Sequence, residues 1–216
     1  GVVKTKPDFE AQSAIKKGYG LFASNLERVN AFKEAKVTIQ GTLQDLLQKV
    51  DVVVDCTPAG IGAKNKPMYE KAGVKAIFEG GEKHGLTNLS FVAQCNYLKA
   101  LGKEFIRVVS CNTTGLCRSL NTIDQSFGIK RAQAVLVRRG ADPPEIKKGP
   151  INAIVPNPPT IPSHHGPDVK TILPHLNITT VALRVPTTIM HMHVVMAELK
   201  NQANINQIIS EFQEAP

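Results

Sequence analysis

The most informative stretch for the fold is Phe105-Ile-Arg-Val-Val109 with the adjoining Ser110-Cys-Asn-Thr-Thr-Gly-Leu-Cys-Arg118, where a predicted apolar strand is followed by a predicted helix. Before this stretch, strand-like and helix-like segments alternate, which predicts βαβ units and a mostly parallel sheet. After it, strand-like segments follow one another without long helices between them, and Ile189-Met-His-Met-His-Val194 alternates strictly. The sequence therefore predicts an α/β dinucleotide-binding domain over residues 1–110 and an α+β catalytic domain with a mixed or antiparallel sheet over residues 111–216.

The first half has the rhythm of a Rossmann-like domain. The predicted strands are Val2–Val3, Gly20–Ala23, Val37–Gln40, Val52–Cys56 and Val74–Glu79, and the predicted helices are Asp8 to about Lys17, Leu26–Ala35, Leu43–Val50 and around Asn65–Ala72. The Gly-x-Gly-x-x-Gly turn that opens such a domain is absent, and Gly1-Val-Val-Lys-Thr-Lys6 matches its second strand. We therefore expect the first βα unit to lie upstream, in a partial chain or a truncated homologue.

The C-terminal half is also expected to be incomplete, because Pro216 falls in a helix-containing segment. A further feature of this half is a proline-rich stretch from Pro143 to Pro167. Its apolar side chains can pack, which predicts a long ordered loop instead of a flexible linker. These side chains are Ile151, Ile154, Val155 and Ile161.

Composition narrows the functional classes. With 216 residues, 42% of them hydrophobic, the chain has ordinary globular composition, and no apolar run approaches the roughly 18 residues that span a bilayer. We expect a cytoplasmic protein without membrane contact. The four cysteines form no Cys-x-x-Cys pair, which indicates neither a metal site nor a disulfide framework. A net charge of +8 suits nucleic acid or phosphorylated small molecules, but scattered basic residues and few aromatic residues disfavour nucleic acid.

Cys111 is the candidate nucleophile. A thiol at a helix N-terminus lies in the positive end of the helix dipole, which favours the thiolate. The backbone amides at this end, together with Asn112, are suited to binding an anion. The alternative is that Cys111 is a small apolar residue closing a strand.

Two histidines and an arginine are candidate partners of Cys111. His191 and His193 are two residues apart on a strand, so both side chains leave from one face, and that face can point at Cys111. Alternatively, they line a polar sheet face or bind a metal weakly. Arg184 is a candidate phosphate ligand because its guanidinium donates in a bidentate manner. The less favoured alternative is a surface charge.

Candidate cofactor residues follow the predicted strands. Thr57-Pro58 and Gly80-Gly81 stand at C-terminal strand ends, where open α/β sheets bind ligands, although Gly-Gly is also a plain turn signal. NAD-specific folds place an acidic residue at the end of the second strand of the Rossmann unit. At the matching end of Val2–Val3, the chain has Lys4-Thr5-Lys6. Two cations and a hydroxyl suit a 2′-phosphate. We expect NADP to be accepted, alongside NAD.

The active-site segment Ser110–Arg118 resembles that of archaeal-type phosphorylating glyceraldehyde-3-phosphate dehydrogenases. Four further motifs fall in the order of that family: Cys56-Thr-Pro-Ala-Gly60, Glu79-Gly-Gly-Glu-Lys83, Pro162-Ser-His-His-Gly-Pro-Asp168 and Arg184-Val-Pro-Thr-Thr-Ile-Met-His-Met-His193. The resemblance covers essentially the whole chain. It implies oxidation of D-glyceraldehyde 3-phosphate with inorganic phosphate and NAD(P), through a cysteine thioester, in glycolysis or gluconeogenesis.

The resemblance also implies roles for particular residues. It favours His191 over His193 as the catalytic base, and it implies substrate contacts at Ser110, Asn112, His164, His165, Gly166 and Arg184. The His164-His165-Gly166 segment is expected to be a turn that presents imidazole and amide donors to a phosphate. For the cofactor, the resemblance adds Arg139, with Arg138 as its adjacent competitor. The other expected cofactor contacts, at Lys4, Thr5, Thr57, Pro58 and Gly81, rest on their positions at strand ends. Homotetramers are common in the family.

Two other functions stay open on the sequence alone. A related aldehyde dehydrogenase, such as aspartate-semialdehyde dehydrogenase, uses the same covalent logic. A non-catalytic basic binding module would explain the missing glycine-rich turn, and salt-dependent RNA affinity would be its signature.

Overall fold

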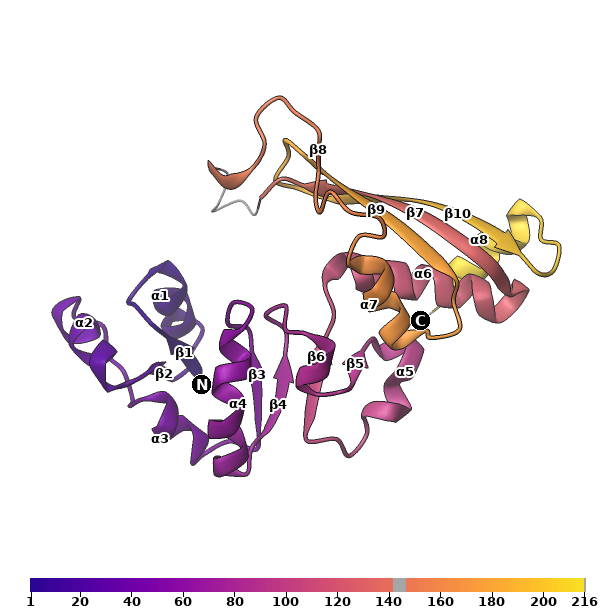
Figure 1. Cartoon of the computed structure of the whole chain (residues 1–216). Helices are drawn as coiled ribbons and strands as arrows, with labels where there is room; N and C mark the ends of the chain where they lie inside the picture. Colours follow the sequence, from indigo (N-terminus) through magenta and orange to yellow (C-terminus); the bar gives the residue numbers. More distant parts are fainter. Residues whose placement is uncertain (142–146, 216) are drawn as a thin grey trace.

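The computed structural model describes residues 1–141 and 147–215, and its first half holds two sheets whose strand pairs are all parallel (Figure 1). The smaller sheet pairs β1 (Val2–Lys4) with β2 (Leu21–Ala23). The larger sheet has the order β3-β4-β6-β5, with β3 (Val52–Asp55), β4 (Lys75–Phe78), β6 (Phe105–Val108) and β5 (Ser90–Phe91). Because β3, β4 and β6 are parallel neighbours, their C-terminal ends meet at one edge of the sheet.

Helices connect these strands, as the alternating pattern predicts. They are α1 (Phe9–Lys16), the 3-10 turn η1 (Leu26–Arg28), α2 (Val29–Glu34), α3 (Leu43–Leu47), α4 (Ile61–Ala72), the 3-10 turn η2 (His84–Leu86) and α5 (Ala93–Ala100). Local caps explain several boundaries. Asp8 accepts a hydrogen bond from the Ala11 amide at the start of α1, and Gly73 ends α4 in the left-handed conformation.

The predicted strand Val37–Gln40 is wrong. The segment runs beside β2, and the Gln40 amide donates to the Leu21 carbonyl, but the only ladder contact here is an isolated bridge between Ala23 and Thr42. Positive φ values at Lys36 and Gly41 bend the chain at both ends of the segment and leave too little straight backbone for a strand.

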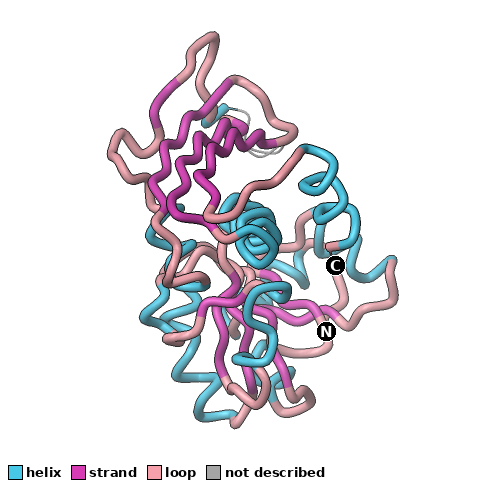
Figure 2. The backbone as a smooth tube through the Cα atoms, turned by 90° about the vertical axis from the view of Figure 1, so that its right-hand side faces the viewer, coloured by secondary structure: helices cyan, strands magenta, loops and turns pink. Residues whose placement is uncertain are grey.

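The second half is built on a mixed sheet of order β10-β7-β9-β8. Its strands are β7 (Ile129–Arg139), β8 (Val155–Pro156), β9 (Ile178–Val185) and β10 (His191–Leu199). Only β7 and β9 are parallel. The helices α6 (Cys111–Phe127) and α7 (His165–Ile172) lie against one face, and α8 (Ile205–Glu214) follows β10 (Figures 1 and 2). The predicted combination of an α/β parallel part with a mixed sheet is confirmed.

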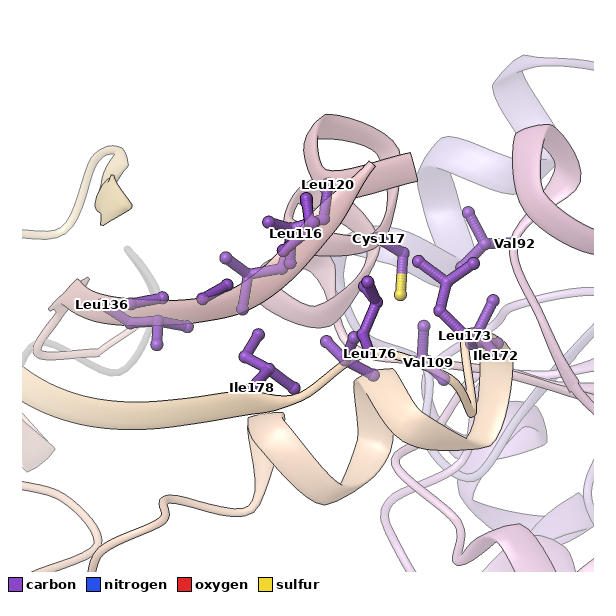
Figure 3. Close-up of a cluster of buried hydrophobic side chains, with 14 of the residues drawn as sticks. Val92, Val109, Leu116, Cys117, Leu120, Leu136, Ile172, Leu173, Leu176 and Ile178 are labelled. Atoms are coloured by element: carbon purple, nitrogen blue, oxygen red, sulfur yellow. The ribbon is translucent and has the colours of Figure 1, made fainter. Parts of the chain in front are cut away.

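The largest apolar core lies between α6, α7 and the mixed sheet (Figure 3). Leu116, Leu120 and Leu136 are almost fully buried in it, and the Cys117 sulfur points into the cluster. Val92 and Val109, which come from the first half of the chain, belong to the same cluster. This shared core fixes the start of α6, and therefore Cys111, against the end of β6.

The proline-rich stretch does not pack as expected. Residues 142–146 of it, including Pro143, lie outside the described residues. Beyond them, Ile151, Ile154, Val155 and Ile161 are all exposed, so the prediction that they pack is wrong. The segment is tied to the sheet mainly by backbone: β8 pairs with β9, and the amides of Asn157 and Ser163 donate to the carbonyls of Ala182 and Thr180. The remaining apolar side chains have no described neighbour to cover them.

Within residues 1–141 and 147–215, no helix combines the length and apolar character needed to cross a membrane. The four cysteines are free thiols. In the same described part of the chain, no group of three or more His, Cys, Asp or Glu side chains is arranged to hold a metal ion.

Candidate active site

Cys111 is the first residue of α6, directly after the end of β6. The Ser110 side chain caps the helix by accepting a hydrogen bond from the Thr113 amide at 3.2 Å. Cys111 is exposed, and α6 is long enough for its N-terminal amides and dipole to favour an anionic sulfur. The alternative that Cys111 merely closes an apolar strand is disfavoured, because that role needs a buried side chain.

His191 is the imidazole that reaches the thiol. Its Nε2 lies 3.5 Å from Cys111 Sγ, across 80 residues of sequence. On the other side of the ring, Nδ1 accepts the Arg139 backbone N–H at 3.1 Å. Because Nδ1 is an acceptor, the proton of the neutral ring lies on Nε2 and faces the sulfur.

His193 has a different partner. Its Nε2 lies 3.0 Å from Asn112 Oδ1, while Asn112 Nδ2 donates to Cys111 Sγ at 3.7 Å. The imidazole therefore fixes which way the Asn112 amide points. Burial lowers the pKa of His193, so that the ring is neutral at physiological pH. Both histidines leave one face of β10 as expected, but only His191 contacts the thiol.

A row of side chains crosses the mixed sheet on this face. Pairing places His191 of β10 opposite Arg138 of β7, and Arg138 opposite Arg184 of β9. Directly paired residues share a face, with neighbouring strands about 4.8 Å apart. We call His191, Arg138 and Arg184 the cross-strand row. The row begins with His191 beside Cys111, and its next two members, Arg138 and Arg184, are positively charged.

Arg138 is the member of the row with spare donor capacity. Its Nη1 donates to the backbone and side-chain oxygens of Asn157 at 3.3 Å, while its buried Nε has no hydrogen-bond partner in the described part of the chain. Burial lowers the pKa of Arg138, a charged Cys111 opposes this, and Arg184 and Arg139 add to the lowering. An anion held beside Arg138 would offset the positive charge that Arg138, Arg139 and Arg184 gather here.

Arg184 is largely committed elsewhere. Its Nε donates to the Gly140 carbonyl at 3.0 Å, and its Nη2 donates to Gly140 and to Lys148, the latter at 2.9 Å. These bonds use the bidentate fork on backbone carbonyls of the segment that follows β7. The sequence pointed to Arg184 as the phosphate ligand and treated Arg138 as a competitor for another role; the geometry gives Arg138 the better placed free donor.

The His164-His165-Gly166 segment is not an open turn. It forms the start of α7, where His165 is fully buried and bonded to Ser163, and the Gly166 amide donates to Thr180 Oγ1 at 3.0 Å. His165 Nε2 has no partner within the described residues. His164 is exposed and stacks on His165 with ring centroids 3.9 Å apart. The amide of Gly166 is thus occupied, which corrects the expected donor role.

The two imidazoles are held neutral. Burial, and then electrostatic repulsion from His164 in its protonated form and from Arg138, lower the pKa of His165 to about 3. Burial and Arg138 also lower the pKa of His164. Helix α7 is in turn tied to the first half by the ion pair between Asp168 and Arg107 of β6, at 2.9 Å. This pair sets the position of the imidazoles relative to the end of β6.

The predicted cofactor residues lie at the C-terminal edge of the parallel strands. Thr57 follows β3, Gly80 and Gly81 follow β4, and Ser110 follows β6, so they line one edge in that order. The first two loops touch closely, because a Cβ on Gly80 would overlap the Thr57 carbonyl oxygen. Gly81 has a φ of +89°, which favours glycine.

Asp55 is a site residue that the sequence did not reveal. It is buried at the end of β3 and accepts hydrogen bonds from the Thr57 amide at 2.9 Å, the Thr57 hydroxyl, Asn65 and Tyr69. Burial raises its pKa, but these hydrogen bonds outweigh it, and the pKa is lowered overall. In the sequence, the one sign of this role is that Asp55 directly follows the apolar run Val52–Val54. The ionised carboxylate fixes the Thr57-Pro58 turn.

The cationic end of β1 is partly neutralised. Lys4 Nζ lies 3.0 Å from Asp8 Oδ2 and 3.7 Å from Glu10 Oε2. Thr5 and Lys6 are exposed beside it. A 2′-phosphate bound here would meet both lysines and the Thr5 hydroxyl, and also the two carboxylates.

The fold and the site define a class. The structure resembles aspartate semialdehyde dehydrogenase II from Vibrio cholerae with a TM-score of 0.67 at 14% identity, covering 95% of this chain and 74% of that one. The complex of the same enzyme with its ligand ASA aligns with a TM-score of 0.65 at 15% identity. The chain therefore has the two-domain dehydrogenase fold.

Sequence comparison identifies the family. Residues 110–216 match the C-terminal domain of glyceraldehyde 3-phosphate dehydrogenase. Curated glyceraldehyde-3-phosphate dehydrogenases from Methanobacterium formicicum and Methanothermus fervidus are 59% and 56% identical to this chain over its whole length. The chain belongs to the glyceraldehyde-3-phosphate dehydrogenase family, and it spans 64% of the length of these relatives.

Proposed function

We propose that the protein oxidises D-glyceraldehyde 3-phosphate with inorganic phosphate and NAD(P)⁺ to 1,3-bisphosphoglycerate, in glycolysis or gluconeogenesis. The observation that carries the proposal is the 3.5 Å approach of His191 to Cys111 at the start of α6, beside the two arginines of the cross-strand row. Family membership supplies the substrate; the geometry supplies a nucleophile, a donor and an anion site.

Cys111 is the nucleophile of this proposal. Its thiolate is stabilised by the helix N-terminus, by Asn112 Nδ2 and by the Nε2–H of His191. Sulfur forms a bond to the aldehyde carbon, and the carbonyl electron pair moves to oxygen. His191 Nε2–H then donates to this oxyanion, so its tautomer makes it a hydrogen-bond donor instead of the base expected from the resemblance.

A nicotinamide cofactor held at Thr57, Pro58 and Gly81 would supply the hydride acceptor that the hemithioacetal anion on Cys111 needs to become a thioester. Inorganic phosphate attacks the thioester carbon, His191 again donates to the oxyanion, and the Cys111 thiolate leaves. Arg138 is proposed to hold the substrate phosphate or the attacking phosphate through the charge of its guanidinium group, with His164 and Arg184 at the margin of that site. Ser110 and Asn112 position the thiol, and neutral His165 supports His164.

The C-terminal edge of the parallel strands fits the cofactor. Thr57, Pro58 and Gly81 present backbone and small side chains near the nicotinamide end, and Arg139 lies beside His191. Lys4 and Thr5 lie at the adenosine end, where two lysines favour NADP while NAD stays acceptable.

The cellular setting follows from the same proposal. We infer a cytoplasmic enzyme whose residues 1–110 and 111–216 form the cofactor and catalytic domains, and which assembles as a homotetramer. Size-exclusion chromatography with light scattering tests the assembly. A monomer at micromolar concentration would contradict it.

The direct test is absorbance at 340 nm when the purified protein meets glyceraldehyde 3-phosphate, phosphate and NADP. We expect reduction that requires phosphate. Reduction with aspartate semialdehyde instead would move the assignment to that class. Salt-dependent RNA binding without any reduction would favour a non-catalytic module.

A further inference from the structure

Asp8 holds the one lysine that ends β1. The Lys4 ammonium lies 3.0 Å from Asp8 Oδ2, and both side chains are only about one-fifth to one-quarter exposed, at 24% and 21%. Glu10 is farther away, at 3.7 Å, and its side chain is 65% exposed. The stronger restraint on Lys4 is therefore Asp8.

Asp8 is also fixed by the helix that follows. Its second carboxylate oxygen, Oδ1, accepts the Ala11 amide at 3.1 Å as the N-cap of α1. Burial raises the pKa of Asp8, but hydrogen bonds from Lys4 and the Ala11 amide outweigh this, and the pKa is lowered overall. The carboxylate is ionised at neutral pH and cannot swing away from Lys4 without losing the cap.

The charges around the end of β1 nearly cancel. Lys4 and Lys6 together carry two positive charges, and Asp8 and Glu10 carry two negative ones. The strand end, which is cationic in sequence, therefore has a net charge close to zero in the folded protein. A 2′-phosphate arriving there must compete with Asp8 for the Lys4 ammonium, whereas a 2′-hydroxyl has no charge to gain from Lys4.

We propose that Asp8 is a specificity-determining residue, which limits the preference for a 2′-phosphorylated dinucleotide by holding Lys4. The inference rests on the proposed function, since it concerns the adenosine end of the same cofactor site. NAD-specific folds usually have an acidic residue at the strand end itself. Here Asp8, four residues beyond the end of β1, is the acidic group that keeps NAD competitive with NADP.

The test measures binding instead of turnover. Calorimetry gives the affinity of the purified protein for adenosine 2′,5′-bisphosphate and for adenosine 5′-monophosphate. Asp8→Asn keeps an N-cap oxygen but removes the charge. We expect it to raise affinity for the bisphosphate about 1.5-fold to fivefold, in the range of partly exposed ion pairs, and to leave the monophosphate unchanged.

Matched variants isolate the pair. Asp8→Ser also keeps a capping oxygen and should behave like Asp8→Asn, which covers the case in which one variant folds poorly. Glu10→Gln removes the more distant charge and should have a smaller effect. In a Lys4→Met background, Asp8→Asn should have none, because the released ammonium is absent. The gain should also shrink in 0.5 M salt through screening.

The outcomes separate the two proposals. If the bisphosphate binds the wild-type protein but Asp8→Asn leaves its affinity unchanged, or shifts both nucleotides equally, the role of Asp8 is overturned while the cofactor site stands. If neither nucleotide binds the wild-type protein, the proposed cofactor site fails, and the role of Asp8 fails with it.

Discussion

The parallel sheets and the mixed sheet carry their candidate residues in different ways. In the two parallel sheets, the residues follow the strand ends, and buried or capping carboxylates hold them: Asp55 fixes Thr57 after β3, and Asp8 holds Lys4 at the end of β1. In the mixed sheet, the cross-strand row stands on the face of the strands, and backbone pairing fixes it. The positions of the residues at strand ends therefore depend on a few side-chain bonds, whereas the positions of the cross-strand row depend on strand register.

The largest effect is expected at the junction between the two sheets. Cys111→Ser should lower kcat/KM about 10⁴-fold to 10⁶-fold, because a hydroxyl is far less nucleophilic than a thiolate and loss of a nucleophile has this scale. Steady-state kinetics measures it, with circular dichroism to verify the fold. Cys95→Ser, at a thiol with a pKa raised by burial to about 11, is the matched control and should retain turnover. Turnover by Cys111→Ser would remove this thiol from the reaction.

The face of the mixed sheet is tested by its two histidines. His191→Ala should lower kcat about 10²-fold to 10⁴-fold, while His193→Ala should cost less because it acts through Asn112. His191→Gln sharpens the comparison, since glutamine keeps an N–H donor but is no base. We expect it to recover part of the loss; activity as low as that of His191→Ala would point to a base.

Register also predicts the role of Arg138. Arg138→Gln should raise KM for the phosphorylated aldehyde or for phosphate by roughly tenfold to a hundredfold, since hydrogen bonds to charged groups are worth about 1.5–3 kcal/mol. Arg131→Gln, on the same strand but exposed and paired with Glu198, is the control. A larger KM effect from Arg184→Gln than from Arg138→Gln would restore Arg184 as the main ligand.

The buried end of α7 predicts a dependence on pH. The pKa of His165 is about 3 in the folded protein, mainly through burial, against an ordinary value of about 6.5. As pH falls below about 6.5 the unfolded chain takes up a proton that the folded one excludes, so stability falls by up to about 1.4 kcal/mol per pH unit until about pH 3.

Urea unfolding at pH 7, 6 and 5 measures this slope. His165→Asn should flatten it, because the substituted side chain does not titrate in this range. An unaltered slope in His165→Asn would mean that the buried imidazole accepts a proton in the folded state.

The smallest effect is expected at the strand ends. Asp55→Asn removes the charge that orients Thr57, which should destabilise the fold by about 1–3 kcal/mol and weaken cofactor binding severalfold without changing KM for the aldehyde. Asp51→Asn, at an exposed position before β3, is the control. A rise in KM for the aldehyde alone would show that the two regions are not separable in this way.

Much of the fold was readable because it is local. Alternating segments predicted the βαβ units, and strict alternation of apolar and polar residues predicted β10. The failures have physical causes as well. Val37–Gln40 has strand composition, but turns at Lys36 and Gly41 leave it a single bridge. Ile151 and Ile161 are apolar, but nothing described covers them.

The sequence by itself determined that a thiol begins α6, that two histidines share a face of β10, and that lysines end β1, since each depends on neighbours within a few residues. Only the tertiary structure decided that His191 meets the thiol, that Arg138 keeps a free donor while Arg184 binds backbone, and that Asp8 neutralises Lys4. These contacts depend on register and chain reversal, which bring together groups that the linear pattern leaves apart.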